Sequence, residues 1–268
     1  MPLRLRPLEI GDVLDETFRM YRRHFVLFAG LSVIIGIPTA AFSGFMLFTL
    51  VDTLPKLQSG IALDPSLLVW YGFFLVVSLV LLPFELGAVT YAACESALGR
   101  PVTVSSVLKA VLRRYFPLLG YGLLITLMLV MFCLLPLWVW IWVSWCVVMP
   151  AMFVENVGLG AAFGRSRQLV EGRWWRTFLL LVLMFVVCYS VDLGLRGFLA
   201  LGQLILQFVI SKTVILLIAG AMAALVDSLI YPLFQIAIVL VYFDLRVRKE
   251  ALDLFQQAQR ISLPAPAS

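Results

Sequence analysis

Long apolar runs and short basic stretches alternate along this chain, and the alternation limits the folds that it can adopt. Among the twenty Lys and Arg residues, all but Lys56, Arg196 and Lys212 fall in four stretches, at 4–23, 100–114, 165–176 and 246–260. An apolar helix of about 20 residues crosses a bilayer, and Lys and Arg concentrate beside spans on the cytoplasmic side. The pattern therefore predicts an all-α polytopic helical membrane protein, with six spans and both termini in the cytoplasm.

The composition excludes an ordinary soluble domain. Hydrophobic residues make up 63% of the chain and charged residues 13%, whereas soluble domains are about half apolar and about a quarter charged. The net charge of +5 does not indicate nucleic-acid binding, because the cations flank apolar runs, where they meet anionic lipid. We therefore expect the lipid bilayer and anionic phospholipid as partners, and no nucleic acid.

The apolar runs predict spans at about 26–50, 67–93, 117–135, 137–154, 177–199 and 213–243. The run 117–154 is nearly twice as long as one span needs at about 1.5 Å per residue, so a tight turn at Leu135 and Pro136 divides it. The segment 197–211 extends the fifth span, lies in the outer interface or re-enters the membrane, and we favour the first two. A seventh span there would place the last basic stretch outside, against the charge bias.

Three of the basic stretches also have apolar residues at the i, i+3, i+4 spacing of an amphipathic helix. Each leads through a basic and aromatic hinge into a pair of spans, whose second member holds Pro83, Pro150 or Pro232. We expect one membrane domain, 1–259, and a disordered tail, 260–268. The domain is expected to contain three repeats, at about 8–99, 100–156 and 157–249. The alternative is that basic, aromatic borders and intramembrane prolines are common to all polytopic proteins.

The chain lacks the residues that most enzyme classes and metal sites need. Its one histidine, His24, excludes catalysis by a histidine pair and a metal site built on histidines. No HExxH, GxSxG, GxGxxG or Walker motif occurs. The cysteines form no CxxC pair, which favours small buried hydrophobic residues at Cys94, Cys133, Cys146 and Cys188. We expect no catalytic residue, no bound metal and no cofactor.

Acidic residues within the apolar runs are candidates for a polar intramembrane site. Asp227 lies near the middle of the sixth predicted span, where an ionisable group is costly, and a following proline frees the carbonyl of Ser228. Glu85, in the second span, is expected nearer the cytoplasmic interface. Either acid belongs to an ion, proton or substrate site, or it fixes helix packing or reaches headgroup water. Asp192 and Arg196, one helical turn apart, are expected to form a simple surface pair.

The basic stretches contain the arginines that we expect to face anionic lipid or a partner at the cytoplasmic surface: Arg22, Arg23, Arg113, Arg114, Arg173, Arg176, Arg246 and Arg248. This basic face and the missing motifs predict a non-catalytic scaffold or accessory module. Its partner would be another protein, a second copy of the chain or anionic lipid. The alternative is a transporter or lipid-handling protein with a polar site near Asp227 and Glu85.

Three stretches, 5–25, 161–176 and 242–253, resemble a bacterial family described as the membrane domain of glycerophosphodiester phosphodiesterases. The more specific parts are the opening stretch, LRPLEIGDVLDETFRMYRRHF, and the segment FDLRVR. The resemblance implies a multi-pass module of the bacterial cytoplasmic membrane whose own function is not established. In enzymes with that name, hydrolysis belongs to a separate soluble barrel with metal-binding carboxylates and histidines, for which this chain has no room. We therefore expect no phosphodiesterase activity.

Overall fold

The computed structural model describes residues 9–58, 65–130, 135–208 and 212–262, and every regular element within these ranges is a helix. Four helical stretches are long and apolar enough to cross a membrane: Ser66–Ala97, Pro136–Val154, Trp174–Leu206 and Ile218–Glu250. A fifth is added if Ile10–Arg23 and Phe25–Pro38, which meet at an 81° bend, count as one span. These lengths and compositions are compatible with a membrane protein.

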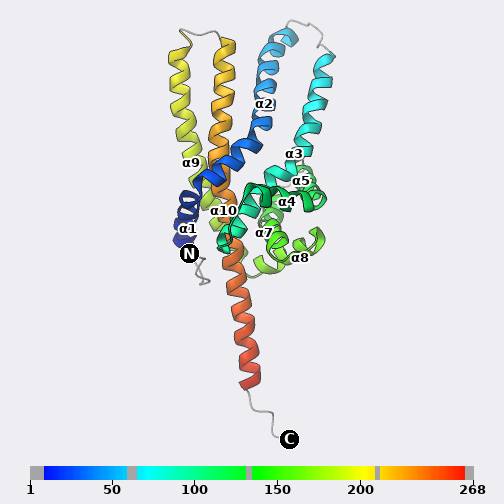
Figure 1. The fold of residues 1–268 in the computed structure, drawn as a ribbon, viewed down its shortest axis with the longest axis vertical. Coiled ribbons are helices and arrows are strands. Elements are labelled where there is room, and N and C mark those ends of the chain that lie inside the picture. The colour runs from blue at the N-terminus through cyan, green and yellow to red at the C-terminus, as the bar shows by residue number, and fades with distance from the viewer. Residues whose placement is uncertain (1–8, 59–64, 131–134, 209–211, 263–268) are drawn as a thin grey trace.

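Short helices alternate with sets of apolar helices along the chain (Figure 1). The short helices are α1 (Ile10–Arg23), α4 (Val104–Arg113) and α8 (Leu159–Val170). The apolar helices that follow them are α2 (Phe25–Gln58) and α3 (Ser66–Ala97), then α5 (Tyr115–Val130), α6 (Leu135–Ser144) and α7 (Val148–Val154), and finally α9 (Trp174–Leu206) and α10 (Lys212–Ser262).

The short helices have a buried face, and caps define where two of them start. α1 begins with a capping box at Glu9 and α4 with one at Thr103. Such caps satisfy N–H groups that have no partner within the helix. A single residue, His24 or Arg114, then separates each of these helices from the apolar helix that follows. The buried side chains of α1 are Val13, Thr17, Met20 and Tyr21.

Two long helical hairpins stand next to each other, α2 with α3 and α9 with α10 (Figure 1). Small residues allow α2 and α10 to approach closely. A Cβ atom on Gly220 would lie 3.6 Å from the Cα of Gly44, and one on Gly36 would lie 2.7 Å from Ser228 Oγ. α10 also packs against α9, α1 and α3, so it joins the two hairpins.

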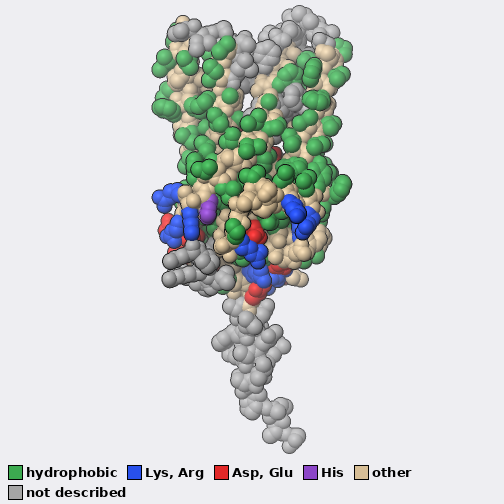
Figure 2. Space-filling model, in the orientation of Figure 1, with side chains coloured by type: hydrophobic (Ala, Val, Ile, Leu, Met, Phe, Trp, Pro, Cys, Tyr) green, Lys and Arg blue, Asp and Glu red, His purple; other side chains and the backbone are tan. Residues whose placement is uncertain are grey.

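Hydrophobic side chains cover the hairpins, and charged side chains gather in a band at their lower ends (Figure 2). On the first half of α3 and the second half of α9, many large apolar side chains are exposed, among them Leu68, Val69, Leu75, Phe198, Leu201 and Ile205. Monomeric soluble proteins rarely expose apolar patches of this extent, and large patches mark membrane or protein contacts. The surface of the hairpins therefore suits a lipid environment.

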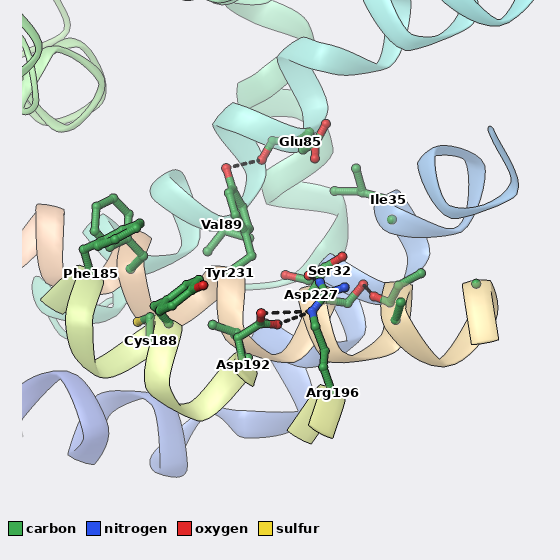
Figure 3. Close-up of a pocket in the computed structure, with 18 of the residues that line it drawn as sticks. Ser32, Ile35, Glu85, Val89, Phe185, Cys188, Asp192, Arg196, Asp227 and Tyr231 are labelled. Atoms are coloured by element: carbon green, nitrogen blue, oxygen red, sulfur yellow. Dashed lines mark hydrogen bonds and ion pairs between the residues drawn. The ribbon is translucent and has the colours of Figure 1, made fainter. Parts of the chain in front are cut away.

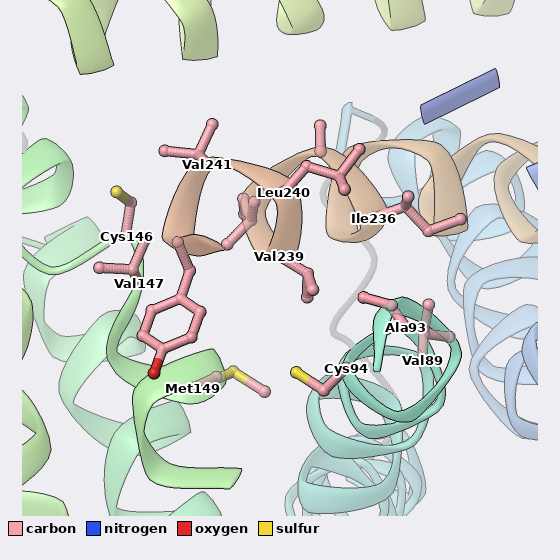
Figure 4. Packing of buried hydrophobic residues seen from close by; sticks show 14 of the residues in the cluster. Val89, Ala93, Cys94, Cys146, Val147, Met149, Ile236, Val239, Leu240 and Val241 are labelled. Carbon is pink, nitrogen blue, oxygen red and sulfur yellow. The ribbon is translucent and has the colours of Figure 1, made fainter. Parts of the chain in front are cut away.

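Part of the buried core lies where α3, α7 and α10 meet (Figure 4). Val89 and Ala93 of α3 face Ile236 and Val239 of α10 there, and Met149 of α7 closes the cluster. The cysteines Cys94, Cys146 and Cys188 are buried and free, as the sequence predicts, and Cys133 lies outside the described residues.

Each predicted span overlaps a described helix, but only four or five helical stretches are long and apolar enough to cross a membrane. The turn predicted at Leu135 and Pro136 is wrong, because both residues belong to the start of α6. The fourth predicted span is broken at 145–147, between α6 and α7. Pro150, which has no N–H group, fits the first turn of a new helix better than the interior of a continuous one. The segment 197–211 extends the fifth span, because α9 runs without interruption to Leu206, and 209–211 lie outside the described residues.

The predicted disordered tail, 260–268, overlaps the end of a described helix. α10 continues to Ser262, so residues 260–262 are helical, and 263–268 lie outside the described part of the chain.

Candidate functional site

A cavity of about 830 Å³ lies between the two hairpins (Figure 3). Its walls come from α2, α3, α6, α9 and α10, and four acidic or basic side chains line it: Glu85, Asp192, Arg196 and Asp227. The rest of the lining is mainly small or aromatic, and includes Gly36, Gly44, Ala223, Trp142, Phe185, Tyr189 and Tyr231. The cavity therefore combines a large apolar surface with a few polar groups, which is typical of ligand sites.

Arg196 joins the two aspartates of the cavity. Its Nε donates to both carboxylate oxygens of Asp192, at 2.8 and 2.9 Å, and its Nη2 donates to Asp227 Oδ1. The Asp227 side chain is 61% exposed, so it does not lie in a dry helix contact. The expectation of a simple surface pair was wrong. Asp192 and Arg196 line the cavity, and Arg196 also binds Asp227 of α10.

Glu85 of α3 is held in place through its backbone. Its carbonyl accepts a hydrogen bond from the Tyr231 hydroxyl at 3.1 Å, and Tyr231 in turn accepts one from Gln235 Nε2 at 2.9 Å (Figure 3). Gln235 Oε1 accepts from the hydroxyl of Thr90 at 3.2 Å. This chain of bonds ties α3 to α10 beside the cavity. Within the described residues, the Glu85 carboxylate itself has no hydrogen bond or ion pair.

Two serines complete the polar part of the lining, and they differ in their hydrogen bonding. Ser228 Oγ donates to the carbonyl of Ala224 at 2.8 Å, as serines within helices commonly do. Ser32 Oγ is buried and makes no hydrogen bond to any residue of the described ranges. A buried hydroxyl without a partner is costly, so Ser32 marks a position where a ligand or water atom would be stabilised.

The structure brings the three residues of the predicted intramembrane site, Asp227, Glu85 and Ser228, to one cavity. Sequence reasoning missed Asp192, Arg196 and Ser32 as members of it. The signal for Arg196 was present, because an ionisable residue inside an apolar run is costly and usually functional. No sequence signal identifies Ser32, since a single serine in an apolar helix is common.

Internal partners hold half of the arginines of the predicted basic face. Arg114 Nη1 donates to the carbonyl of Val157 at 2.8 Å, and Nη2 donates to Asn156. Carboxylates bind three others: Asp244 pairs with Arg176 and Arg248, and Glu250 pairs with Arg246. Arg22, Arg23 and Arg113 are exposed, and Arg173 is half-buried. The four arginines with internal partners are partly exposed, as Arg173 is, so the most accessible part of the predicted face is Arg22, Arg23 and Arg113.

No group of three or more His, Cys, Asp or Glu side chains within the described ranges has the arrangement of a metal site. Comparisons of the chain with protein-family models, with curated proteins and with solved structures give no match.

Proposed function

We propose that this chain is a six-span protein of the bacterial cytoplasmic membrane, with both ends in the cytoplasm, that binds an amphipathic molecule in the cavity between its hairpins. The observation that carries the proposal is the gathering of Glu85, Asp192, Arg196 and Asp227 around one apolar cavity. On this proposal the chain is the membrane module that its resemblance implies, and it has no phosphodiesterase activity.

The energetic cost of these charges supports a functional role. A charged residue at the centre of a membrane helix costs about 2.5–3.5 kcal/mol on insertion scales. Apolar residues would pack the hairpins without that cost. The volume also fits, since ligand cavities are about 300–1,000 Å³ and this one is about 830 Å³. A site of this size and polarity suits a molecule with a polar headgroup and an apolar chain.

Three hinge contacts support the proposed repeat. The Tyr21 hydroxyl donates to the carbonyl of Leu229 in α10 at 2.8 Å, and the Tyr115 hydroxyl donates to that of Val80 in α3 at 3.2 Å. Trp174 Nε1 donates to the carbonyl of Trp140 in α6 at 3.4 Å. In each case an aromatic residue at the hinge of one proposed unit contacts the second span of another unit. The second unit contacts the first, the third contacts the second, and the first contacts the third. Three units arranged in a ring would make such contacts.

The proposed ligand site is tested by filling the cavity. Ala223 lines the cavity, so the substitution Ala223→Trp should block it. In lipid nanodiscs, at least one of dodecylamine, dodecanol and dodecyl phosphate should raise the unfolding temperature of the wild-type protein. A site at 100 times its Kd stabilises a protein by about 2.7 kcal/mol. The Ala223→Trp protein should lose this response.

Ala161→Trp is the matched control, because Ala161 is exposed on α8 and outside the cavity. This protein should respond as the wild type does. If none of the three amphiphiles stabilises the wild-type protein, or if Ala223→Trp responds equally, the cavity is not the proposed site.

A basic face for anionic lipid or a partner is a second proposed function, supported by the exposed arginines of the first two hinges. Replacing Arg22, Arg23 and Arg113 with Gln should weaken the binding of the nanodisc-embedded protein to anionic vesicles. The expected loss is about 1 kcal/mol for each cation removed. Co-sedimentation at low and high salt measures it, with zwitterionic vesicles as the control. Arg114 is left unchanged because it binds Asn156 and Val157. Unchanged binding would remove this function.

A further inference from the structure

We infer that the cavity binds an amphiphile with a protonated amine headgroup, and that the Glu85 carboxylate and the Ser32 hydroxyl hold the amine. The inference rests on the proposed function and names the class of ligand. It follows from the balance of charge in the cavity, from an unsatisfied hydroxyl and from the aromatic lining.

The ionisable groups of the cavity favour a cation. Three carboxylates and one guanidinium line the cavity, so its ionised lining carries more negative than positive charge. Both aspartates already share Arg196, whose N–H groups point to them. The Glu85 carboxylate has no ion pair within the described residues. An anionic headgroup would meet repulsion from the three carboxylates, whereas a cation would find the Glu85 carboxylate without an ion pair among the described residues.

The Ser32 hydroxyl gives an independent indication of where the headgroup lies. Ser32 is 6% exposed, lines the same cavity as Glu85, and its Oγ lacks a hydrogen-bond partner among the described residues. A hydroxyl oxygen accepts hydrogen bonds, so an ammonium N–H can donate to it. A quaternary ammonium has no N–H group and would leave Ser32 unsatisfied. The site therefore favours an amine that retains N–H groups.

The aromatic and apolar walls suit the rest of such a ligand. Phe185, Tyr189 and Tyr231 line the cavity, and the faces of aromatic rings attract cations within about 6 Å. A second cavity, of about 590 Å³, borders the first and shares Gly36, Gly44, Ala224 and Ser228 with it. Its remaining lining is wholly apolar and includes Val33, Ile37, Ala41, Phe45, Ala221 and Leu225. We assign this second cavity to the alkyl chain.

The test compares four amphiphiles of equal chain length on the protein in nanodiscs: dodecylamine, dodecyltrimethylammonium, dodecanol and dodecyl phosphate. Dodecylamine should bind most tightly to the wild-type protein. Glu85→Gln should lower its affinity about tenfold or more, because the negative charge that pairs with the ammonium is lost, and should weaken dodecanol binding much less. Ser32→Ala should reduce the preference for dodecylamine over the quaternary ammonium. The matched control is Glu95→Gln, since Glu95 pairs with Arg100 outside the cavity.

The outcomes separate this inference from the proposed function. If none of the amphiphiles binds, both fail. If dodecyl phosphate or dodecanol binds as tightly as dodecylamine, the cavity is a ligand site but the amine assignment is overturned. Equal binding of the amine and the quaternary ammonium also overturns it, as does an unchanged amine affinity in Glu85→Gln. Glu85→Asp retains the charge and should retain the preference for dodecylamine. Binding by this variant shows whether a loss in Glu85→Gln comes from the missing carboxylate charge or from misfolding.

Discussion

Replacing Asp244 with Ala should destabilise the protein by about 3–5 kcal/mol, because breaking a buried ion pair leaves its partners without their countercharge. The Asp244 side chain is 0% exposed and pairs with Arg176 and Arg248. Arg248 Nε donates to it at 2.8 Å, from one turn further along α10. Arg176 belongs to the start of α9, so the carboxylate ties together the base of the hairpin that forms one wall of the cavity.

Unfolding by SDS titration in mixed micelles measures this effect. Glu95→Ala is the matched control, because the pair of Glu95 with Arg100 is long, at 3.4 Å, and the arginine is exposed. Exposed pairs contribute about 0–1 kcal/mol, so the control should remain close to the wild type. Equal stability of Asp244→Ala and Glu95→Ala would show that the buried carboxylate does not hold the hairpin together.

Replacing Arg196 with Leu should destabilise the protein by about 2–3 kcal/mol, because Asp192 and Asp227 then face each other across an apolar cavity without a countercharge. The effect should be smaller than for Asp244, since Asp227 is 61% exposed and reaches the cavity. The same SDS titration applies.

A combined variant separates the charge from the packing at this site. Asp192→Asn and Asp227→Asn, added to Arg196→Leu, remove all three charges while keeping similar side-chain volumes. If the charges account for the loss, the triple variant should be more stable than Arg196→Leu alone, because energies of contacting residues are not additive. A triple variant that is less stable than the single one would contradict the ion-pair explanation.

Much of the helical architecture could be predicted from the sequence, because hydropathy and periodicity are local properties. The apolar runs correspond to helices, and the i, i+3, i+4 spacing identified α1, α4 and α8 as short amphipathic elements. The break between α6 and α7 at 145–147 was not predicted. Tryptophans and other large apolar residues surround it, so hydropathy does not vary there, and only Pro150 indicates a new helical start.

The candidate site was predictable only in part. The cost of an acid in an apolar run identified Asp227 and Glu85, and the proline effect added Ser228. The same argument did not show that Arg196 would meet Asp227, thirty-one positions away, or that internal partners would hold Arg114.

The sequence by itself determined the helical class, the long apolar runs that suit a membrane protein, the short amphipathic helices and the presence of polar residues inside the apolar runs. Only the tertiary structure decided which of those residues meet. The physical reason is that a side chain's partner depends on how helices cross and rotate. Gly36, Gly44 and Gly220 allow α2 and α10 to approach closely, and the two hairpins to which these helices belong line the cavity. Such contacts depend on pairs of residues far apart in the chain, and no local pattern contains them.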